Sequence, residues 1–80
     1  SVTIGNGVTK IGEKAFYDCT SLKAVYCKRT TPPTGGSSMF SNNAAGRRIF
    51  VPASDNDSII KAYKAKQYWS DYKNDIFEEE

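Results

Sequence analysis

The residues in this sequence that are best suited to molecular recognition are two aromatic side chains with a basic residue near each. Tyr26 and Phe50 occupy equivalent places in two short alternating segments, and Thr3 occupies that place in a third. Lys28 and Arg48 each lie two residues from one of the rings, so they share its side of the strand. Aromatic and arginine side chains dominate binding energy at protein interfaces. We therefore expect a ligand-binding column of five residues: Thr3, Tyr26, Lys28, Arg48 and Phe50.

Two further interpretations of this column involve no ligand. Tyr26 and Phe50 can pack on each other as a cross-strand pair, which stabilises a sheet without any partner. Alternatively, a C-terminal helix can fold over both rings. Exposed apolar patches commonly contact partners, so the binding interpretation stands beside these two alternatives.

Enzymatic and metal chemistry find little support in the residue types present. The chain has no His, which removes the usual general base, the serine-type triad and the commonest zinc ligand. Asp55-Asn56-Asp57 is not followed by the glycine and glutamate that complete a calcium-binding loop, so we interpret it as a helix cap. We expect a protein that is not an enzyme and that holds no cofactor and no metal ion.

The two cysteines, Cys19 and Cys27, are too few for a closed thiolate metal site. A disulfide between them is possible in a secreted protein, because they lie close together in the sequence. Free cysteine is also among the most buried residue types, and both positions suit a small apolar side chain. We expect two thiols that pack in the core.

Length and charge limit the chain to one small domain and to few kinds of partner. Its 80 residues include 11 Lys and Arg against 9 Asp and Glu. The resulting net charge of +2 gives little reason to expect a nucleic-acid partner. No apolar run approaches the roughly 18 residues that a membrane-spanning helix needs, so we expect no transmembrane segment.

A sequence repeat organises the first two thirds of the chain. Val2 corresponds to Val25 and Val25 corresponds to Ile49, at nearly equal offsets, in three segments that alternate in polarity. Phe16 precedes the second segment by the spacing at which Phe40 precedes the third. Short strands at a fixed spacing predict an α/β repeat fold, a short solenoid with a parallel β ladder.

Three parts follow from this pattern. Residues 1–52 form two and a half repeats, residues 53–77 form a C-terminal helical cap, and residues 78–80 form a solvated acidic tail. The second repeat is degenerate at residues 29–46, where prolines and glycines are expected to abolish its second β-segment. In the first repeat, Gly12–Cys19 is expected to form one or two helical turns.

The cap is expected to consist of two amphipathic pieces. The first is a helix from Ser58 to about Tyr68, started by Asp55 or Asp57, and the second runs from Trp69 to Phe77. The predicted core comprises the inward side chains of the strands and of the segments between them: Val2, Ile4, Val8, Ile11, Ala15, Phe16, Cys19, Leu22, Val25, Cys27, Met39, Phe40, Ile49 and Val51.

The segment from Ile11 to Leu22, IGEKAFYDCTSL, resembles the signature of BspA-like leucine-rich repeats, I-G-x-x-A-F-x-x-C-x-x-L. Ile49–Pro52, Tyr63–Ala65 and Trp69–Tyr72 are similar to the segment that commonly ends such proteins. The resemblance covers most of residues 1–77. It implies that the fold is a short leucine-rich-repeat solenoid with a parallel β ladder and a C-terminal helical cap. It also implies a bacterial protein at the cell surface or secreted, of which this chain is a C-terminal, non-catalytic module.

The resemblance also implies an adhesin-like role, in which the module mediates or supports binding to protein or glycan on a host or on neighbouring bacteria. A purely structural capping piece is one alternative, with oligomers formed through the exposed edge of the first strand. A glycan-binding surface is another, for which Trp69 and the tyrosines at 17, 63, 68 and 72 offer a platform, although helical spacing favours packing for most of them.

Overall fold

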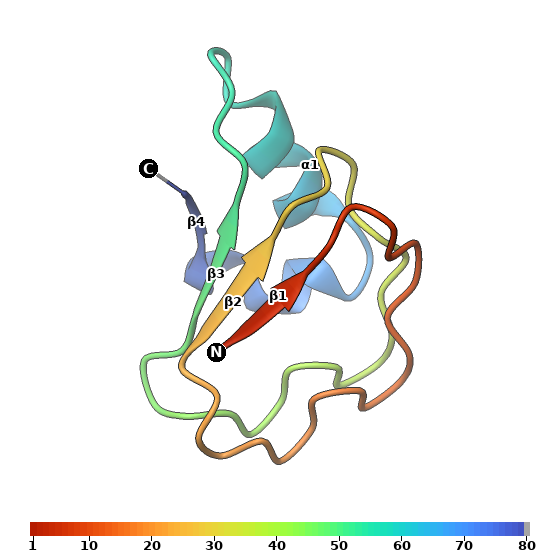
Figure 1. Ribbon diagram of the computed structural model, residues 1–80, viewed down its shortest axis with the longest axis vertical. Helices are drawn as coiled ribbons and strands as arrows, with labels where there is room; N and C mark the ends of the chain where they lie inside the picture. Colours follow the sequence, from red (N-terminus) through yellow and green to blue (C-terminus); the bar gives the residue numbers. More distant parts are fainter. Residues whose placement is uncertain (80) are drawn as a thin grey trace.

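Four short strands form one parallel sheet in the order in which they follow along the chain (Figure 1). The computed structural model describes residues 1–79. Its strands are β1 (Val2–Ile4), β2 (Ala24–Cys27), β3 (Arg48–Val51) and β4 (Ile76–Glu78). With two helices beside the sheet, the protein has an α/β fold.

The first three strands and their register are as the sequence predicts. Val2 lies opposite Val25, and Val25 lies opposite Ile49, so the three apolar side chains point to the same face of the sheet. Tyr26 likewise lies opposite Phe50, on the other face. The predicted parallel ladder is confirmed.

The fourth strand, β4, is not expected from the sequence. Ile76 pairs with Ile49, and the N–H of Glu79 donates a 2.8 Å hydrogen bond to the carbonyl of Val51. A helical piece reaching Phe77 is therefore wrong, as is a solvated tail that begins at residue 78. Glu80, the last residue of the predicted tail, lies outside the described residues.

Main-chain N–H groups along the first loop (residues 5–23) alternate between two kinds of partner. Every second N–H donates to the carbonyl three positions earlier and so closes a turn; these donors are Ala15, Tyr17 and Cys19. The N–H groups between them donate to carbonyls of the second loop (residues 28–47) at 2.9–3.1 Å; these donors are Lys14, Phe16 and Asp18. The expected helical turns over Gly12–Cys19 are therefore wrong, because a helix would use all these groups within the segment.

The two loops run side by side with matching backbone conformations. Lys14 and Ser38, which are equivalent in the predicted sequence repeat, both have a φ of +57°. Asp18 and Asn42, a second equivalent pair, have φ values of +61° and +60°. The side-chain amide of Asn42 donates to the carboxylate of Asp18, which ties the two turns together.

The second β-segment of the degenerate repeat survives as a single bridge. Lys10 and Thr34 form an isolated parallel β-bridge, in which Ile11 donates to the Thr34 carbonyl at 2.8 Å and Thr34 donates to the Thr9 carbonyl at 3.0 Å. No strand forms in residues 29–46, as expected, and this one bridged pair is all that remains of the segment. Pro32 and Pro33, which carry no N–H, precede the bridge and limit it to this one residue pair.

Two helices, α1 (Ser58–Ala65) and the 3₁₀-helix η1 (Trp69–Asp75), follow β3 and lie on one face of the sheet (Figure 1). The first helix is shorter than expected because Lys66 is extended, with φ −71° and ψ 138°.

The helix start also differs from the prediction, since Asp57 makes no side-chain cap hydrogen bond. The amide oxygen of Asn56 instead accepts from the N–H of Ser58, and the hydroxyl of Ser54 accepts from the N–H of Ile59.

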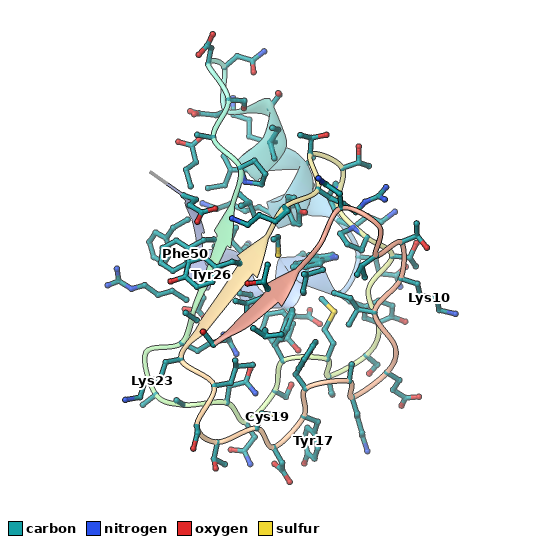
Figure 2. The ribbon with its side chains drawn as sticks, in the orientation of Figure 1. Lys10, Tyr17, Cys19, Lys23, Tyr26 and Phe50 are labelled. Atoms are coloured by element: carbon teal, nitrogen blue, oxygen red, sulfur yellow. The ribbon has the colours of Figure 1, made fainter. Side chains whose placement is uncertain are left out.

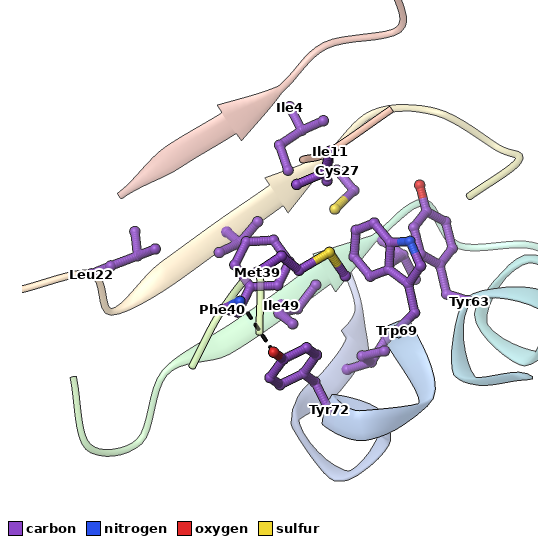
Figure 3. Packing of buried hydrophobic residues seen from close by; sticks show 13 residues of the cluster. Ile4, Ile11, Leu22, Cys27, Met39, Phe40, Ile49, Tyr63, Trp69 and Tyr72 are labelled. Carbon is purple, nitrogen blue, oxygen red and sulfur yellow. Dashed lines mark hydrogen bonds between the residues drawn. The ribbon is translucent and has the colours of Figure 1, made fainter. Parts of the chain in front are cut away.

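The core lies between the sheet, the loops and the helices (Figure 3). The buried ring of Phe40 stacks on the half-buried ring of Phe16 at the edge of the core, with centroids 5.5 Å apart and planes 12° apart. The buried residues are Ile4, Ile11, Leu22, Val25, Cys27, Met39, Phe40, Ile49, Val51, Tyr63, Trp69, Tyr72 and Ile76.

Five predicted core residues of β1 and the first loop are not fully buried. Val8, Ala15 and Cys19 are exposed, and Val2 and Phe16 are half-buried. These residues belong to the outermost strand and loop, and within residues 1–79 no further layer covers their outer side. The predicted burial of Val8, Ala15 and Cys19 is wrong for that reason.

Candidate functional site

A row of three adjacent aromatic side chains crosses the face of the sheet opposite the helices. Tyr26 and Phe50 stack with ring centroids 5.2 Å apart and planes 15° apart (Figure 2). The ring centroid of Phe77 lies 6.5 Å from that of Phe50, with the two planes tilted by 43°. We call Tyr26, Phe50 and Phe77 the aromatic row. The cross-strand pairing of Tyr26 with Phe50 is confirmed, while the alternative in which a helix covers them is wrong, because both helices pack on the other face.

A surface hollow of about 620 Å³, which we call the front hollow, opens beside the aromatic row. It is lined by Tyr26, Arg48, Phe50, Phe77, Glu78 and Glu79. Two of the five predicted site residues lie outside its lining. Thr3 is adjacent to Tyr26 in the sheet register but is exposed beyond the rings. Lys28 lies at the rim, with its ammonium 6.0 Å from the Tyr26 ring centroid.

The two basic side chains near the row differ in whether a carboxylate pairs with them. The Nζ of Lys28 lies 3.1 Å from Oε1 of Glu79, in an exposed ion pair of the kind that adds little stability. The guanidinium of Arg48 lies 5.0 Å from the Phe77 ring centroid, within cation–π distance. Within residues 1–79, no carboxylate forms an ion pair with Arg48. Arg48 is therefore the cation in this hollow that is available to an anionic group.

Sequence analysis missed three residues of the front hollow: Phe77, Glu78 and Glu79. They lie in or directly after β4, which pairs with β3. The paired residues Ile49 and Ile76 are farther apart in the sequence than the residues that the predicted repeat aligns. The sequence pattern that indicates β4 is the alternation of Ile76, Phe77 and Glu78, in which only Phe77 points outward. This pattern is too short to identify a strand by itself.

A second set of contacts lies where the helices meet the second loop. The N–H of Phe16 donates to the carbonyl of Met39 at 2.9 Å, and its own carbonyl accepts from the side-chain amide of Asn43 at 2.8 Å. For Phe40, both partners are side chains, one from η1 and one from the second loop itself. The N–H of Phe40 donates to the Tyr72 hydroxyl at 3.2 Å, and its carbonyl accepts from Nη1 of Arg47 at 2.6 Å (Figure 3).

The helical segment supplies further polar contacts to the second loop. Nε1 of Trp69 donates to the carbonyl of Pro33 at 2.8 Å, and the hydroxyl of Tyr63 donates to the carbonyl of Arg29 at 2.8 Å. Trp69 and Tyr63 are fully buried, so neither is available to a sugar. The platform of Trp69 and tyrosines considered from the sequence is therefore wrong for these two residues.

The buried thiol of Cys27 lies beside the Tyr63 hydroxyl, in surroundings that disfavour ionisation. Burial raises the pKa of the Cys27 thiol to about 12, although its side-chain hydrogen bond with Tyr63 acts in the opposite direction. Burial likewise raises the pKa of Tyr63. Both groups stay protonated at neutral pH, so neither serves as a nucleophile there. Cys19, by contrast, is a free and exposed thiol.

Within residues 1–79, no three Cys, Asp or Glu side chains gather in the way that metal ligands do. Neither helix of the described residues has both the length and the apolar character required to cross a bilayer. No family model, curated protein or solved structure matches the chain.

Proposed function

We propose that this chain is the non-catalytic closing module of a leucine-rich-repeat solenoid of the BspA-like kind, carried at a bacterial cell surface, and that its aromatic row binds protein. The IGEKAFYDCTSL signature supports the family, and the matching φ angles at equivalent positions of the two loops support a solenoid. A C-terminal place in the parent protein belongs to the same proposal.

The hydrogen bond from the N–H of Phe40 to the Tyr72 hydroxyl carries the closing role. In a solenoid, each layer satisfies the main chain of the layer before it, and the last layer requires a different partner. The N–H of Phe16 donates to the main-chain carbonyl of Met39 in the second loop, while the N–H of Phe40 donates to the side chain of Tyr72 in η1. The Tyr72 side chain thus takes the place that a further loop would occupy.

The binding role is supported by the partly exposed aromatic row and by the charge of Arg48, which pairs with no carboxylate of residues 1–79. Tyr26 and Phe50 cover each other's inner faces, and cations lie against Tyr26 and Phe77 at the two ends of the row. Sugars bind aromatic residues through open ring faces, which this arrangement offers poorly. Protein side chains, which can pack along ring edges and pair with Arg48, are the better fit.

Selection from a displayed random peptide library tests the binding role. We expect the wild-type chain to enrich peptides whose affinity falls about tenfold or more in a Tyr26→Ala/Phe50→Ala variant with an intact thermal transition. The exposed Tyr17 provides the matched control, since Tyr17→Ala should bind as the wild type does. A library that yields no peptide dependent on Tyr26 and Phe50 would contradict the proposal, and enrichment on a glycan array instead would favour the glycan alternative.

Self-association is a second candidate, favoured by a different surface. An apolar hollow of about 250 Å³ lies beside β1 and is lined in part by Val2, Ile4, Val8, Ala15 and Phe16. In residues 1–79, β1 pairs with β2 alone, so its other edge is open. Light scattering should then show a mass that rises with concentration in the wild type and stays monomeric in Val8→Lys. A concentration-independent monomer for both chains would exclude this candidate.

A further inference from the structure

Asn6 and Gly7 form the tip of the turn that follows β1. Both residues are exposed, and the N–H of Val8 closes the turn by donating to the carbonyl of Gly5 at 3.1 Å. Within residues 1–79, neither the side chain of Asn6 nor the N–H of Gly7 forms a hydrogen bond. Because Gly7 has no side chain, its main-chain nitrogen can approach the carboxamide of Asn6 closely. These are the two groups that join when an asparagine cyclises to a succinimide.

The structure sets Asn6 apart from the other four asparagines of the chain. Three of the four have side chains held in hydrogen bonds: Asn42, Asn43 and Asn56. The fourth, Asn74, lies inside η1. None of the four is followed by glycine, and a side chain on the next residue hinders attack by its main-chain nitrogen. Asn6 is therefore the asparagine best placed to cyclise.

The guanidinium of Arg29 lies against the main-chain carbonyl of Asn6. Its Nη1 donates to that oxygen at 3.2 Å, and its Nε donates to the carbonyl of Thr31 at 3.1 Å, so the side chain is held between the two loops. No carboxylate of residues 1–79 forms an ion pair with Arg29. A surface hollow of about 240 Å³ opens to solvent at this place and is lined by Asn6, Arg29, Thr30 and Thr31.

We propose that Asn6 and Gly7 are a site of spontaneous modification, at which Asn6 becomes isoaspartate and Arg29 directs that outcome. The main-chain nitrogen of Gly7 attacks the carboxamide carbon of Asn6, a carbon–nitrogen bond forms, and the carboxamide nitrogen leaves as ammonia with the proton from Gly7. One water then opens the succinimide. Attack at the original main-chain carbonyl gives isoaspartate, and attack at the original side-chain carbonyl gives aspartate. The proposal does not depend on the binding function of the aromatic row.

Arg29 favours the first of these two openings. Its Nη1 donates to the oxygen on which negative charge develops when water attacks the main-chain carbonyl. Opening there leaves the same oxygen in a free carboxylate beside the guanidinium, and arginine binds carboxylates more strongly than it binds neutral carbonyls. In the described part of the chain, the side-chain carbonyl of Asn6 has no such donor. The isoaspartyl product therefore exchanges a carbonyl contact for an ion pair.

Incubation of the folded chain at mildly alkaline pH, followed by peptide mapping with mass spectrometry, tests the site. We expect the peptide that contains Asn6 to convert first, while the peptides that contain the other asparagines stay unchanged. Gly7→Ala should show no conversion in the time in which half of the wild type reacts. A Cβ at Gly7 meets nothing within 4 Å, so this variant keeps the fold. Earlier conversion at another asparagine, or an equal rate in Gly7→Ala, would overturn the proposal.

The ratio of isoaspartate to aspartate at position 6, measured by fragmentation of the mapped peptide, tests the role of Arg29. We expect this ratio to be about twofold to tenfold lower in Arg29→Gln than in the folded wild type, the range expected for one hydrogen bond. Arg48→Gln is the matched control, because Arg48 does not contact Asn6, and it should keep the wild-type ratio.

The denatured wild-type chain gives a reference that requires no variant. Its Arg29 is no longer held at Asn6, so its ratio of isoaspartate to aspartate should match that of Arg29→Gln. Thermal melting establishes that Arg29→Gln is folded. Equal ratios in the folded wild type, the denatured wild type and Arg29→Gln would overturn the directing role of Arg29.

Discussion

The Tyr72 hydroxyl lies 3.2 Å from the main-chain nitrogen of Phe40, and in the preceding loop the carbonyl of Met39 lies 2.9 Å from the nitrogen of Phe16. The two nitrogens belong to equivalent phenylalanines of successive loops and donate in equivalent places. One acceptor is main chain and the other is a side chain. Tyr72 therefore ends the series of loop-to-loop hydrogen bonds without leaving a buried donor unpaired.

Tyr72→Phe removes this acceptor and keeps the ring. We expect the free energy of unfolding to fall by about 1–3 kcal/mol, because the buried N–H of Phe40 would lose its partner. Denaturant titration measures the change. Tyr17→Phe is the matched control, since Tyr17 is 43% exposed and its loss of a hydroxyl should have little effect. Equal stability of the two variants would show that Tyr72 does not serve this role.

Gly36→Ala tests the close approach of the two loops. A Cβ at Gly36 would lie 2.5 Å from the carbonyl carbon of Gly12 and from the main-chain nitrogen of Glu13, so one loop must move. We expect a loss of about 1–3 kcal/mol, the usual effect of overpacking. Gly12→Ala is the control on the opposing loop, because a Cβ there meets nothing within 4 Å. Thermal melting of both variants measures the difference, and a Gly36→Ala transition no lower than that of Gly12→Ala contradicts the packing described.

Alkaline pH should destabilise the fold through Cys27 and Tyr63. Burial raises the pKa of Cys27 from its ordinary value of 9.0 to about 12, so the folded state favours the protonated thiol more than the unfolded state does. This stabilisation is fully present below pH 9 and is lost as the pH rises from 9 toward 12. Tyr63, whose pKa burial also raises, acts in the same direction above its ordinary value of 10.0.

Denaturant titrations at increasing pH measure this loss, which is at most about 1.4 kcal/mol per pH unit for each group. In Cys27→Ala the free energy of unfolding should fall less steeply with rising pH than in the wild type. Tyr63→Phe should likewise show a less steep fall, because it removes the other ionising group. A wild-type stability that stays level from pH 9 upward would contradict the burial of both groups.

The two thiols should differ in their reaction with an alkylating reagent. Cys19 is exposed and Cys27 is buried, so the native chain should take up a single label, at Cys19, and a second only after unfolding. Mass spectrometry with peptide mapping identifies the labelled position. Cys19→Ser should leave the native chain unlabelled. Rapid native labelling of Cys27, or a chain that gains two hydrogens on reduction, would contradict the free thiols described.

The strands were predictable because their side chains repeat in register. Val2, Val25 and Ile49 occupy one position of a parallel ladder, and the spacing that aligns them in the sequence also aligns them in space. The same alignment brought Tyr26 against Phe50. Arg48 was correctly placed beside that pair because strand alternation puts it on the same face.

The loops and β4 could not be predicted in the same way. The apolar spacing of Ala15, Phe16 and Cys19 fits a short helix. Every second N–H of this segment nevertheless donates to the second loop, and no pattern within the segment indicates that partner. Cys19 sits in a position that suits a small buried residue and is nevertheless exposed, because burial depends on what covers the loop. Phe77 joins the aromatic row through a connection whose length departs from the repeat.

The order of the strands in the sheet, β1-β2-β3-β4, has a kinetic consequence. The pairs Val2–Val25, Val25–Ile49 and Ile49–Ile76 are all separated by similar lengths of chain. Loop-closure entropy grows so slowly with length that these three closures differ by only about 0.1 kcal/mol. No step requires the two ends of the chain to meet. We expect each strand to dock on its neighbour in turn, so that refolding is governed by repeated short closures rather than by one rare long-range encounter.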